Sequence, residues 1–303
     1  MKYWFVLILL FVAAPFVGAE DNKQAVPSRV LIVSIDGCRP DVALRADMPH
    51  LRSLMARGSF SFWANTTDVA ITLPSHTSML TGVTPDKHGI HYNDDKPTNK
   101  PEHPLVPTLF DLAKKKGYTT AMCAGKSKFR AFDTEGALDW KFIKEASDDE
   151  VASAAAAIVH EHQPQVLFVH FPDCDRVGHA IGWGTPEQLA SVGKADVALG
   201  IVLSALDDEH LTDSTLIILS ADHGGNGRTH GGLDPRSRTI PWIAAGPGVK
   251  QNYDLTLNIK LVIYTYDTFA TACDVLRIGL PSNCDGKPIL DIFQNRELLQ
   301  AAP

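Results

Sequence analysis

The sequence predicts an α/β fold with a mostly parallel central sheet and helices on both faces. Apolar runs of strand length alternate with helical patterns along most of the 303-residue chain. Polar, chemically active residues follow several of these runs, as they do at the ligand-binding edge of a parallel sheet. No repeat or low-complexity linker divides the chain, so we expect one domain over residues 20–303.

The predicted strands are rich in β-branched and apolar residues and contain few polar ones, which is typical of strands buried on both faces. Residues 60–71 read as extended chain without a clear strand boundary. The predicted strands are residues 29–36, 118–125, 165–171, 214–220 and 239–245.

The predicted helices show apolar residues at helical spacing, and Gly58 and Gly117 are stop signals for two of them. Residues 72–82 resemble a strand-to-helix transition, with Pro74 in the first turn, where its missing N–H costs nothing. Thr72 would then lie just before a helix N-terminus, which favours a developing anion. The other predicted helices are residues 48–57, 108–116, 148–162, 186–206 and 266–278.

The first residues have the pattern of a signal peptide. Lys2 precedes an apolar run over residues 3–17, and Val17-Gly18-Ala19 fits a small-residue cleavage site before Glu20. The run is short for a bilayer span, which favours cleavage over a signal anchor. We therefore expect a signal peptide over residues 1–19, no stable membrane span after cleavage, and a periplasmic or secreted protein.

Five cysteines follow the predicted cleavage site, and an odd number leaves at least one unpaired within the chain. Cys273 and Cys284 are close in sequence, while Cys38 and Cys174 each lie near acidic residues of interest. The sequence selects neither pairing.

The chain has a formal charge of -7 and a pI near 5.9. This balance argues against nucleic acid as a structural partner. A small phosphorylated substrate remains compatible with it, because bound metal ions can supply local positive charge.

The most informative stretch is the glycine-rich segment 220–232, which directly follows a predicted strand. Carboxylate and imidazole are zinc-type ligands. A polar loop with surface histidines is the alternative for Asp222-His223-Gly224 alone. With residues from two other predicted strand ends, the candidate ligands number six, which suits two ions better than one: Asp36, Asp175, His179, Asp222, His223 and His230. Two ions about 4 Å apart can clamp the attacking and leaving oxygens of a displacement at phosphorus.

Thr72 is the candidate nucleophile for such a site. Its hydroxyl is weak at neutral pH, but coordination to zinc would lower its pKa and activate it. Ser75 and the backbone N–H groups after Pro74 would stabilise charge nearby. A helix-capping hydroxyl is the alternative role for Thr72.

Five motifs together resemble the alkaline phosphatase superfamily, and most closely its type I phosphodiesterase/nucleotide pyrophosphatase family. They occur in the family's order and span most of the chain, from about Arg29 to Leu290. The motifs are Ile35-Asp36-Gly37, Thr72-Leu-Pro-Ser-His76, Pro85-Asp-Lys-His-Gly-Ile90, Asp175-Arg-Val-Gly-His179 and Asp222-His223-Gly224.

The resemblance implies two zinc ions and a division of their ligands. The first ion would be held by Asp36, Thr72, Asp222 and His223. The second would be held by Asp175, His179 and His230. Thr72 would form a covalent phospho-enzyme that water hydrolyses, and Asn93 matches the asparagine that donates to a phosphate oxygen. His88 and His76 are expected to be structural.

The chain also departs from the family pattern. Ser75 stands where family phosphodiesterases carry asparagine, and only six residues separate His223 from His230, where larger relatives insert long segments. Lys126-Ser-Lys128 resembles a segment of phosphonoacetate hydrolases and of some threonine-dependent monoesterases, whose cations bind extra substrate charge. A solvated lysine pair is the alternative.

These observations favour a zinc-dependent hydrolase of phosphodiesters or pyrophosphates. A phosphomonoesterase or phosphonate hydrolase that uses Lys126 and Lys128 is the second hypothesis. A non-catalytic metal-binding protein on the same scaffold is the third, although that class predicts missing ligands and none is missing. A sulfatase is disfavoured, because no Cys/Ser-x-Pro-x-Arg sequence begins at Thr72.

Overall fold

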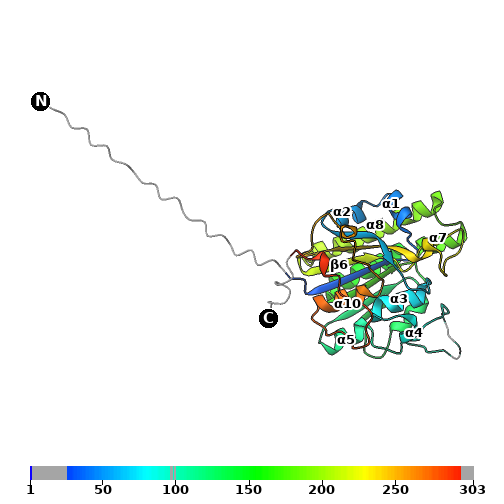
Figure 1. The fold of residues 1–303 in the computed structure, drawn as a ribbon. Coiled ribbons are helices and arrows are strands. Elements are labelled where there is room, and N and C mark those ends of the chain that lie inside the picture. The colour runs from blue at the N-terminus through cyan, green and yellow to red at the C-terminus, as the bar shows by residue number, and fades with distance from the viewer. Residues whose placement is uncertain (2–25, 96–97, 99, 295–303) are drawn as a thin grey trace.

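The computed structural model describes residue 1, residues 26–95, residue 98 and residues 100–294. Residues 2–19 of the predicted signal peptide lie outside this part, and the single-domain boundary at residue 20 stays a prediction. An eight-stranded sheet forms the centre of the molecule (Figure 1). In spatial order its strands are β4 (Trp140–Ile143), β3 (Thr120–Ala124), β5 (Val166–Phe171), β1 (Arg29–Ile35), β6 (Thr215–Ser220), β7 (Thr239–Ala245), β2 (Gly58–Asn65) and β8 (Tyr253–Asp254).

The predicted mostly parallel sheet is confirmed. Five neighbouring strands, from β4 to β6, run parallel, and β7 is antiparallel to both β6 and β2. In β1, at the middle of the sheet, every residue after Arg29 is buried, which explains its continuous apolar sequence. The register aligns Ser34 of β1 with His170 of β5 and Ser220 of β6, so these three strands end side by side.

Helices cover both faces of the sheet, as predicted (Figure 1). One layer contains α1 (Pro40–Arg45), α2 (Pro49–Ala56), α6 (Asp148–His162), α7 (Asp173–Ala180) and α8 (Pro186–Asp208). The opposite layer contains α3 (Thr72–Thr81), α4 (Pro85–His88), α5 (Leu109–Lys115) and α10 (Asp267–Val275). The short helix α9 (Pro235–Arg238) lies in the connection before β7, and 3₁₀ helices occupy Ser127–Phe132, Thr212–Ser214, Leu255–Leu257 and Leu290–Ile292.

Two local predictions differ from the structure. The extended segment 60–71 is strand only as far as Asn65, and a loop then leads to α3. Thr72 is the first residue of α3 and not the residue before it, because Ile71 has the extended conformation of an N-cap. The nucleophile candidate therefore belongs to the first helical turn.

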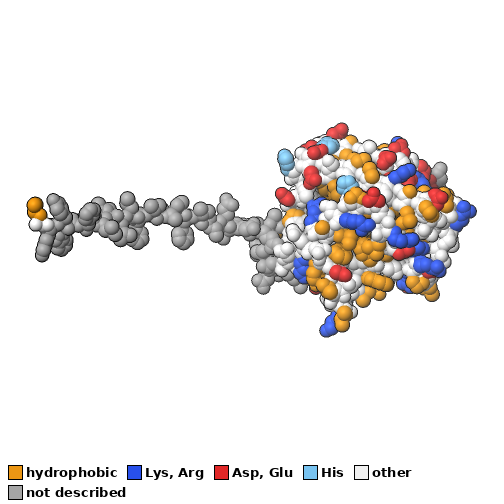
Figure 2. All heavy atoms as spheres, turned by 90° about the horizontal axis from the view of Figure 1, so that it is seen from above, with side chains coloured by type: hydrophobic (Ala, Val, Ile, Leu, Met, Phe, Trp, Pro, Cys, Tyr) orange, Lys and Arg blue, Asp and Glu red, His pale blue; other side chains and the backbone are white. Residues whose placement is uncertain are grey.

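Helix α8 has the length and apolarity of a membrane-spanning helix, but it packs within the fold. Of the residues in its most apolar window, 56% are buried. It contacts α1, α2, α6 and α7, and residues such as Val192, Leu199 and Val202 are fully buried. Figure 2 shows acidic, basic and apolar side chains mixed over the face of the molecule seen there.

The first turns of α6 and α7 are joined by two carboxylates, the buried one of Asp148 and the partly exposed one of Asp173. The Asp173 backbone N–H donates to Asp148 Oδ1 at 3.0 Å, and the Asp148 N–H donates to Asp173 Oδ2 at 3.0 Å. Burial, and then repulsion from Asp173, raise the pKa of Asp148 to about 8. In the described part of the chain, Asp148 Oδ2 has no hydrogen-bond partner, which fits a carboxyl that keeps its proton.

The raised pKa of Asp148 predicts that the free energy of unfolding falls as the pH rises. The folded chain holds a proton on Asp148 that the unfolded chain releases above a pKa of about 4. The contribution of Asp148 to the free energy of unfolding is therefore complete below pH 4 and declines until the pH reaches about 8.

Asp148→Asn keeps the acceptor oxygen and removes the titration. We expect the variant to unfold at higher denaturant concentration than the unmodified protein at pH 8, with a much smaller difference at pH 5. Denaturant titrations at the two pH values measure this, and Glu135→Gln is the control for an exposed carboxyl. An equal effect of Asp148→Asn at both pH values would contradict the assignment.

Candidate metal centre and active site

The candidate site lies where neighbouring parallel strands end. Asp36 follows β1, Asp175 lies in α7 just after β5, and Asp222 follows β6. Lys126 follows β3, the next strand outward. Since the carboxyl ends of parallel strands share one edge of the sheet, segments far apart in sequence bring their side chains together there.

One group of possible metal ligands is fully buried and consists of Asp36, Asp222 and His223. His223 Nε2 lies 3.4 Å from Asp36 Oδ1 and 3.2 Å from Asp222 Oδ2. The Thr72 hydroxyl lies 3.5 Å from the same nitrogen. The turn after β6 therefore brings the sequential residues Asp222 and His223 to one point, where a strand would direct them apart.

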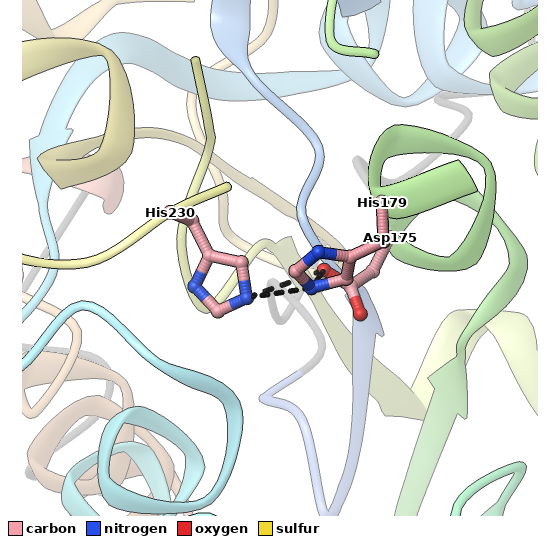
Figure 3. A group of neighbouring side chains, drawn as sticks. All are labelled: Asp175, His179 and His230. Carbon is pink, nitrogen blue, oxygen red and sulfur yellow. Dashed lines mark hydrogen bonds and ion pairs between the residues drawn. The ribbon is translucent and has the colours of Figure 1, made fainter. Parts of the chain in front are cut away.

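A second group consists of Asp175, His179 and His230, drawn in Figure 3. Asp175 and His179 are four residues apart on α7, so one face of the helix presents both. His230 approaches from the loop after β6. The three facing atoms form a triangle, with His230 Nε2 lying 3.1 Å from His179 Nε2 and 3.6 Å from Asp175 Oδ1, and the remaining side measuring 3.5 Å.

These spacings suit tetrahedral metal ions. Bonds of about 2.0–2.2 Å to nitrogen and oxygen place neighbouring ligand atoms roughly 3.3–3.6 Å apart. In the described part of the chain, one carboxylate oxygen of each aspartate is buried without a hydrogen-bond partner: Asp36 Oδ1, Asp175 Oδ1 and Asp222 Oδ2. Buried carboxylate oxygens are rarely left unpaired. The same three atoms face the histidine nitrogens, so the residues fit two ions.

The protonation states also suit metal ligation. Burial, and then the charge of His230, lower the pKa of His223 to about 4, and burial lowers the pKa of His230. Both rings are therefore neutral at physiological pH, as metal ligands must be. Burial, and then repulsion from Asp36, raise the pKa of Asp222 well above its ordinary value. A bound cation would reverse this shift, because it stabilises the carboxylate.

Lys126 connects the two groups. Its ammonium donates to Asp36 Oδ2 at 2.7 Å and to Asp175 Oδ2 at 2.6 Å, and the residue is 8% exposed. Burial would lower the pKa of Lys126, but the two carboxylates raise it above its ordinary value. Although burial opposes the ionised form of Asp36, the same ammonium and His170 hold the pKa of Asp36 well below its usual range. The sequence suggested that Lys126 binds substrate, whereas here it binds the ligand carboxylates.

Asn93 and Lys128 lie beside the nucleophile candidate. The Leu73 backbone N–H donates to Asn93 Oδ1 at 3.0 Å, which leaves the Asn93 amide nitrogen as a donor. Lys128 donates to the Asn93 carbonyl at 2.8 Å. A cavity of about 460 Å³ begins here, and its lining includes Leu73, Tyr92, Lys128 and Arg130.

Three further residues of the nucleophile region are structural in this arrangement. Ser75 is fully buried, and its hydroxyl donates to the backbone carbonyl of Asp222 at 2.7 Å, so it helps to position the backbone of that ligand. His76 contacts the Thr72 carbonyl and the Ser34 hydroxyl, each at 2.8 Å. His88 accepts from the Ile90 N–H at 3.1 Å, as expected of a residue that supports its loop.

Sequence reasoning missed two residues of the site. His170 of β5 contacts Asp36 Oδ2 at 2.8 Å, the oxygen that also binds Lys126. Trp183 lies against the histidines of the second group. A histidine within an apolar strand was the available signal for His170, while nothing in the sequence marked Trp183. The five cysteines are free thiols in the structure.

Comparisons with known proteins agree with these observations. The family model of type I phosphodiesterases/nucleotide pyrophosphatases matches residues 30–229, more than half of the chain. An uncharacterized pyrophosphatase/phosphodiesterase of Schizosaccharomyces pombe is 28% identical over 69% of this chain and 48% of its own length. The human bis(5'-adenosyl)-triphosphatase ENPP4 is 24% identical over 72% of this chain and 52% of its own.

The fold is shared with a solved structure. Murine ectonucleotide pyrophosphatase/phosphodiesterase 5, an inactive threonine-to-alanine variant in complex with AMP, superposes with a TM-score of 0.72. That comparison covers 88% of this chain and 100% of the murine chain, at 14% identity. The chain spans about half the length of the curated relatives that it matches. It belongs to the type I phosphodiesterase/nucleotide pyrophosphatase family.

Proposed function

We propose that the protein is an exported hydrolase of phosphoric diesters or pyrophosphates that uses two zinc ions and a covalent phospho-threonine. One observation carries the proposal: the Thr72 hydroxyl lies 3.5 Å from His223, within a buried group of metal-ligand type. Membership of the type I phosphodiesterase/nucleotide pyrophosphatase family supports hydrolysis of phosphoric esters as the reaction class. The signal-peptide pattern of residues 1–19 supports export to the periplasm or the exterior.

Zinc is the proposed metal because carboxylate and imidazole ligands in small groups are typical of it. Asp36, Asp222 and His223 would hold one ion together with Thr72, and Asp175, His179 and His230 would hold the other. When bound, the ions supply positive charge that lowers the pKa of the Thr72 hydroxyl and stabilises charge on the phosphoryl oxygens.

The protein groups divide the reaction between them. Thr72 Oγ1 releases its proton to solvent and attacks phosphorus, the bond to the leaving oxygen breaks, and an alcohol or a phosphate departs with a proton from solvent. Water then attacks the phospho-threonine, the bond from phosphorus to Oγ1 breaks, a phosphomonoester is released and the hydroxyl is restored. The free amide nitrogen of Asn93 donates to a non-bridging oxygen. The N-terminus of α3, at which Thr72 lies, favours the negative charge that develops there.

The cavity beside Thr72 suggests a substrate with a sizeable organic group. A volume of about 460 Å³ falls within the usual range for small-molecule sites. Leu73 and Tyr92 offer apolar and aromatic surface to such a group. The charged lining is mixed, with the basic residues Lys100, Lys128 and Arg130 and the acidic residues Asp94, Asp95 and Glu102. The AMP bound to the murine relative and the bis(5'-adenosyl)-triphosphatase activity for which ENPP4 is named support a nucleotide as this group.

Thr72→Ala tests the nucleophile. We expect it to lower hydrolysis of a nitrophenyl diester by more than about 100-fold, because the attacking oxygen is lost. Zinc content, measured by elemental analysis of the same sample, should remain close to that of the unmodified protein. Thr72→Ser is the matched control, since it keeps a hydroxyl and should retain part of the activity. Full activity in Thr72→Ala would mean that solvent supplies the nucleophile.

A phosphomonoesterase or phosphonate hydrolase is the second candidate, and the position of Lys128 favours it. Its ammonium binds the carbonyl of Asn93, the residue proposed to contact the phosphoryl group. A lysine there would offset the second negative charge of a monoester. Lys126 serves this role less directly, because its ammonium binds the carboxylates of Asp36 and Asp175, which are themselves candidate metal ligands.

A nitrophenyl panel of monoester, diester and phosphonate separates the two candidates. We expect the unmodified protein to cleave the diester fastest, and Lys128→Ala to lower monoester cleavage at least tenfold more than diester cleavage. Lys194→Ala, on the exposed side of α8, is the control for loss of a surface cation. A preference for the monoester or the phosphonate, abolished by Lys128→Ala, would favour the second candidate and contradict the first.

A further inference from the structure

Trp183 lies between the segments that carry the metal ligands. It belongs to the short connection between α7 and α8, and it is only 7% exposed despite its size. Its indole Nε1 donates to the Gly37 carbonyl at 2.8 Å, and its backbone N–H donates to the Gly227 carbonyl at 2.8 Å. These bonds reach the loop after β1 and the loop after β6. Trp183 therefore joins three ligand-bearing segments, its indole by the bond to Gly37 and its backbone by the bond to Gly227.

Three glycines form the slot that holds the indole. A Cβ atom added to Gly225 would lie 2.3 Å from the ring, one added to Gly178 would lie 2.7 Å away, and one added to Gly37 would lie 3.2 Å away. Each glycine is a near neighbour of a ligand. Gly37 follows Asp36, Gly178 precedes His179, and Gly225 comes two residues after His223. Only residues without a side chain permit this approach of backbone to ring.

The same ring contacts both histidines of the second group. Its centroid lies 5.3 Å from that of His179 at an interplanar angle of 85° and 5.7 Å from that of His230 at 65°. Such edge-to-face contacts are favourable and directional. The Nδ1 atoms of His179 and His230 contact the carbonyls of Arg228 and Ala70, each at 3.0 Å, which leaves both Nε2 atoms to face the ion.

We propose that Trp183 is the positioning residue of the Asp175–His179–His230 group and sets the affinity of that group for its ion. The proposal rests on the two-ion function above. His179 should depend on Trp183 most, because its side chain is 47% exposed, whereas that of His230 is 6% exposed. Asp36, Asp222 and His223 are fully buried and have their own polar contacts, so the first group should be affected less.

Zinc titration against a chromophoric chelator tests the proposal on the full chain. The unmodified protein should bind two ions. An Asp222→Asn background disables the first group, so that the remaining binding constant reports the second. In both backgrounds we expect Trp183→Leu to weaken binding at the second group by 10- to 100-fold, the usual cost of losing an outer-shell partner. Trp140→Leu is the matched control. Trp140 also stacks on a histidine, His162 of α6, but it lies on the edge strand β4, which carries none of the proposed ligands.

Gly178→Ala tests the same contact from the other side and does not remove the tryptophan. Alanine favours helix α7, so a loss of zinc affinity would come from the clash with the indole and not from helix propensity. We expect Gly178→Ala to weaken the second ion, and Gly178→Ala combined with Trp183→Leu to be no weaker than Trp183→Leu alone. Such non-additivity identifies a direct contact.

Unchanged zinc affinity in both Trp183→Leu and Gly178→Ala, with two ions bound by the unmodified protein, would overturn the role of Trp183 and leave the two-ion function intact. Fewer than two ions in the unmodified protein would contradict the two-ion function, and the role of Trp183 with it. Equal weakening at both groups would also overturn the proposal, because it would show a general loss of structure.

Discussion

Three carboxylates, those of Asp36, Asp175 and Asp222, are buried at one edge of the sheet, and the Lys126 ammonium binds the first two of them. Burying an unpaired carboxylate is costly, so the protein has to compensate the remaining negative charge. Burial, and then repulsion from Asp36, raise the pKa of Asp222 well above its ordinary value, which reflects this cost. Two divalent ions would remove that need and would add the positive charge that an anionic phosphoester requires.

Lys126 also explains why the two groups remain distinct. It binds Oδ2 of Asp36 and Oδ2 of Asp175. The Oδ1 atom of each carboxylate is left to face the histidine or histidines of its own group. His170 adds a second contact to Oδ2 of Asp36. Each carboxylate is therefore oriented before any ion binds, and such preorganisation is what a catalytic site needs from its supporting residues.

The sequence predicted those parts of the site that depend on local pattern. Apolar runs that end in Asp36 or Asp222 located the edge of the sheet, and the spacing of Asp175 and His179 fits one helical face. The contacts of His170 and Trp183 could not be predicted in this way, because they join residues more than 100 positions apart. The sequence placed Lys126 at the right edge, but only the three-dimensional structure shows which carboxylates it binds.

The same limit applies to the fold. The strand β4 (Trp140–Ile143) was missed because it is short, half-exposed and at the sheet edge, where no continuous apolar run is required. Helix α6 was predicted with its observed ends, and in the structure a capping box of Ser147 and Glu150 fixes where it begins. Thr72 was misplaced by one residue, an error within the usual uncertainty of helix ends.

Diffraction from zinc-soaked crystals at the zinc absorption edge tests the central claim most directly. We expect two anomalous peaks roughly 4 Å apart. One should lie among Asp36, Thr72, Asp222 and His223, and the other among Asp175, His179 and His230. The Lys126 ammonium should still bind Oδ2 of Asp36 and Oδ2 of Asp175. A single peak shared by all three aspartates, or peaks away from both groups, would contradict the account.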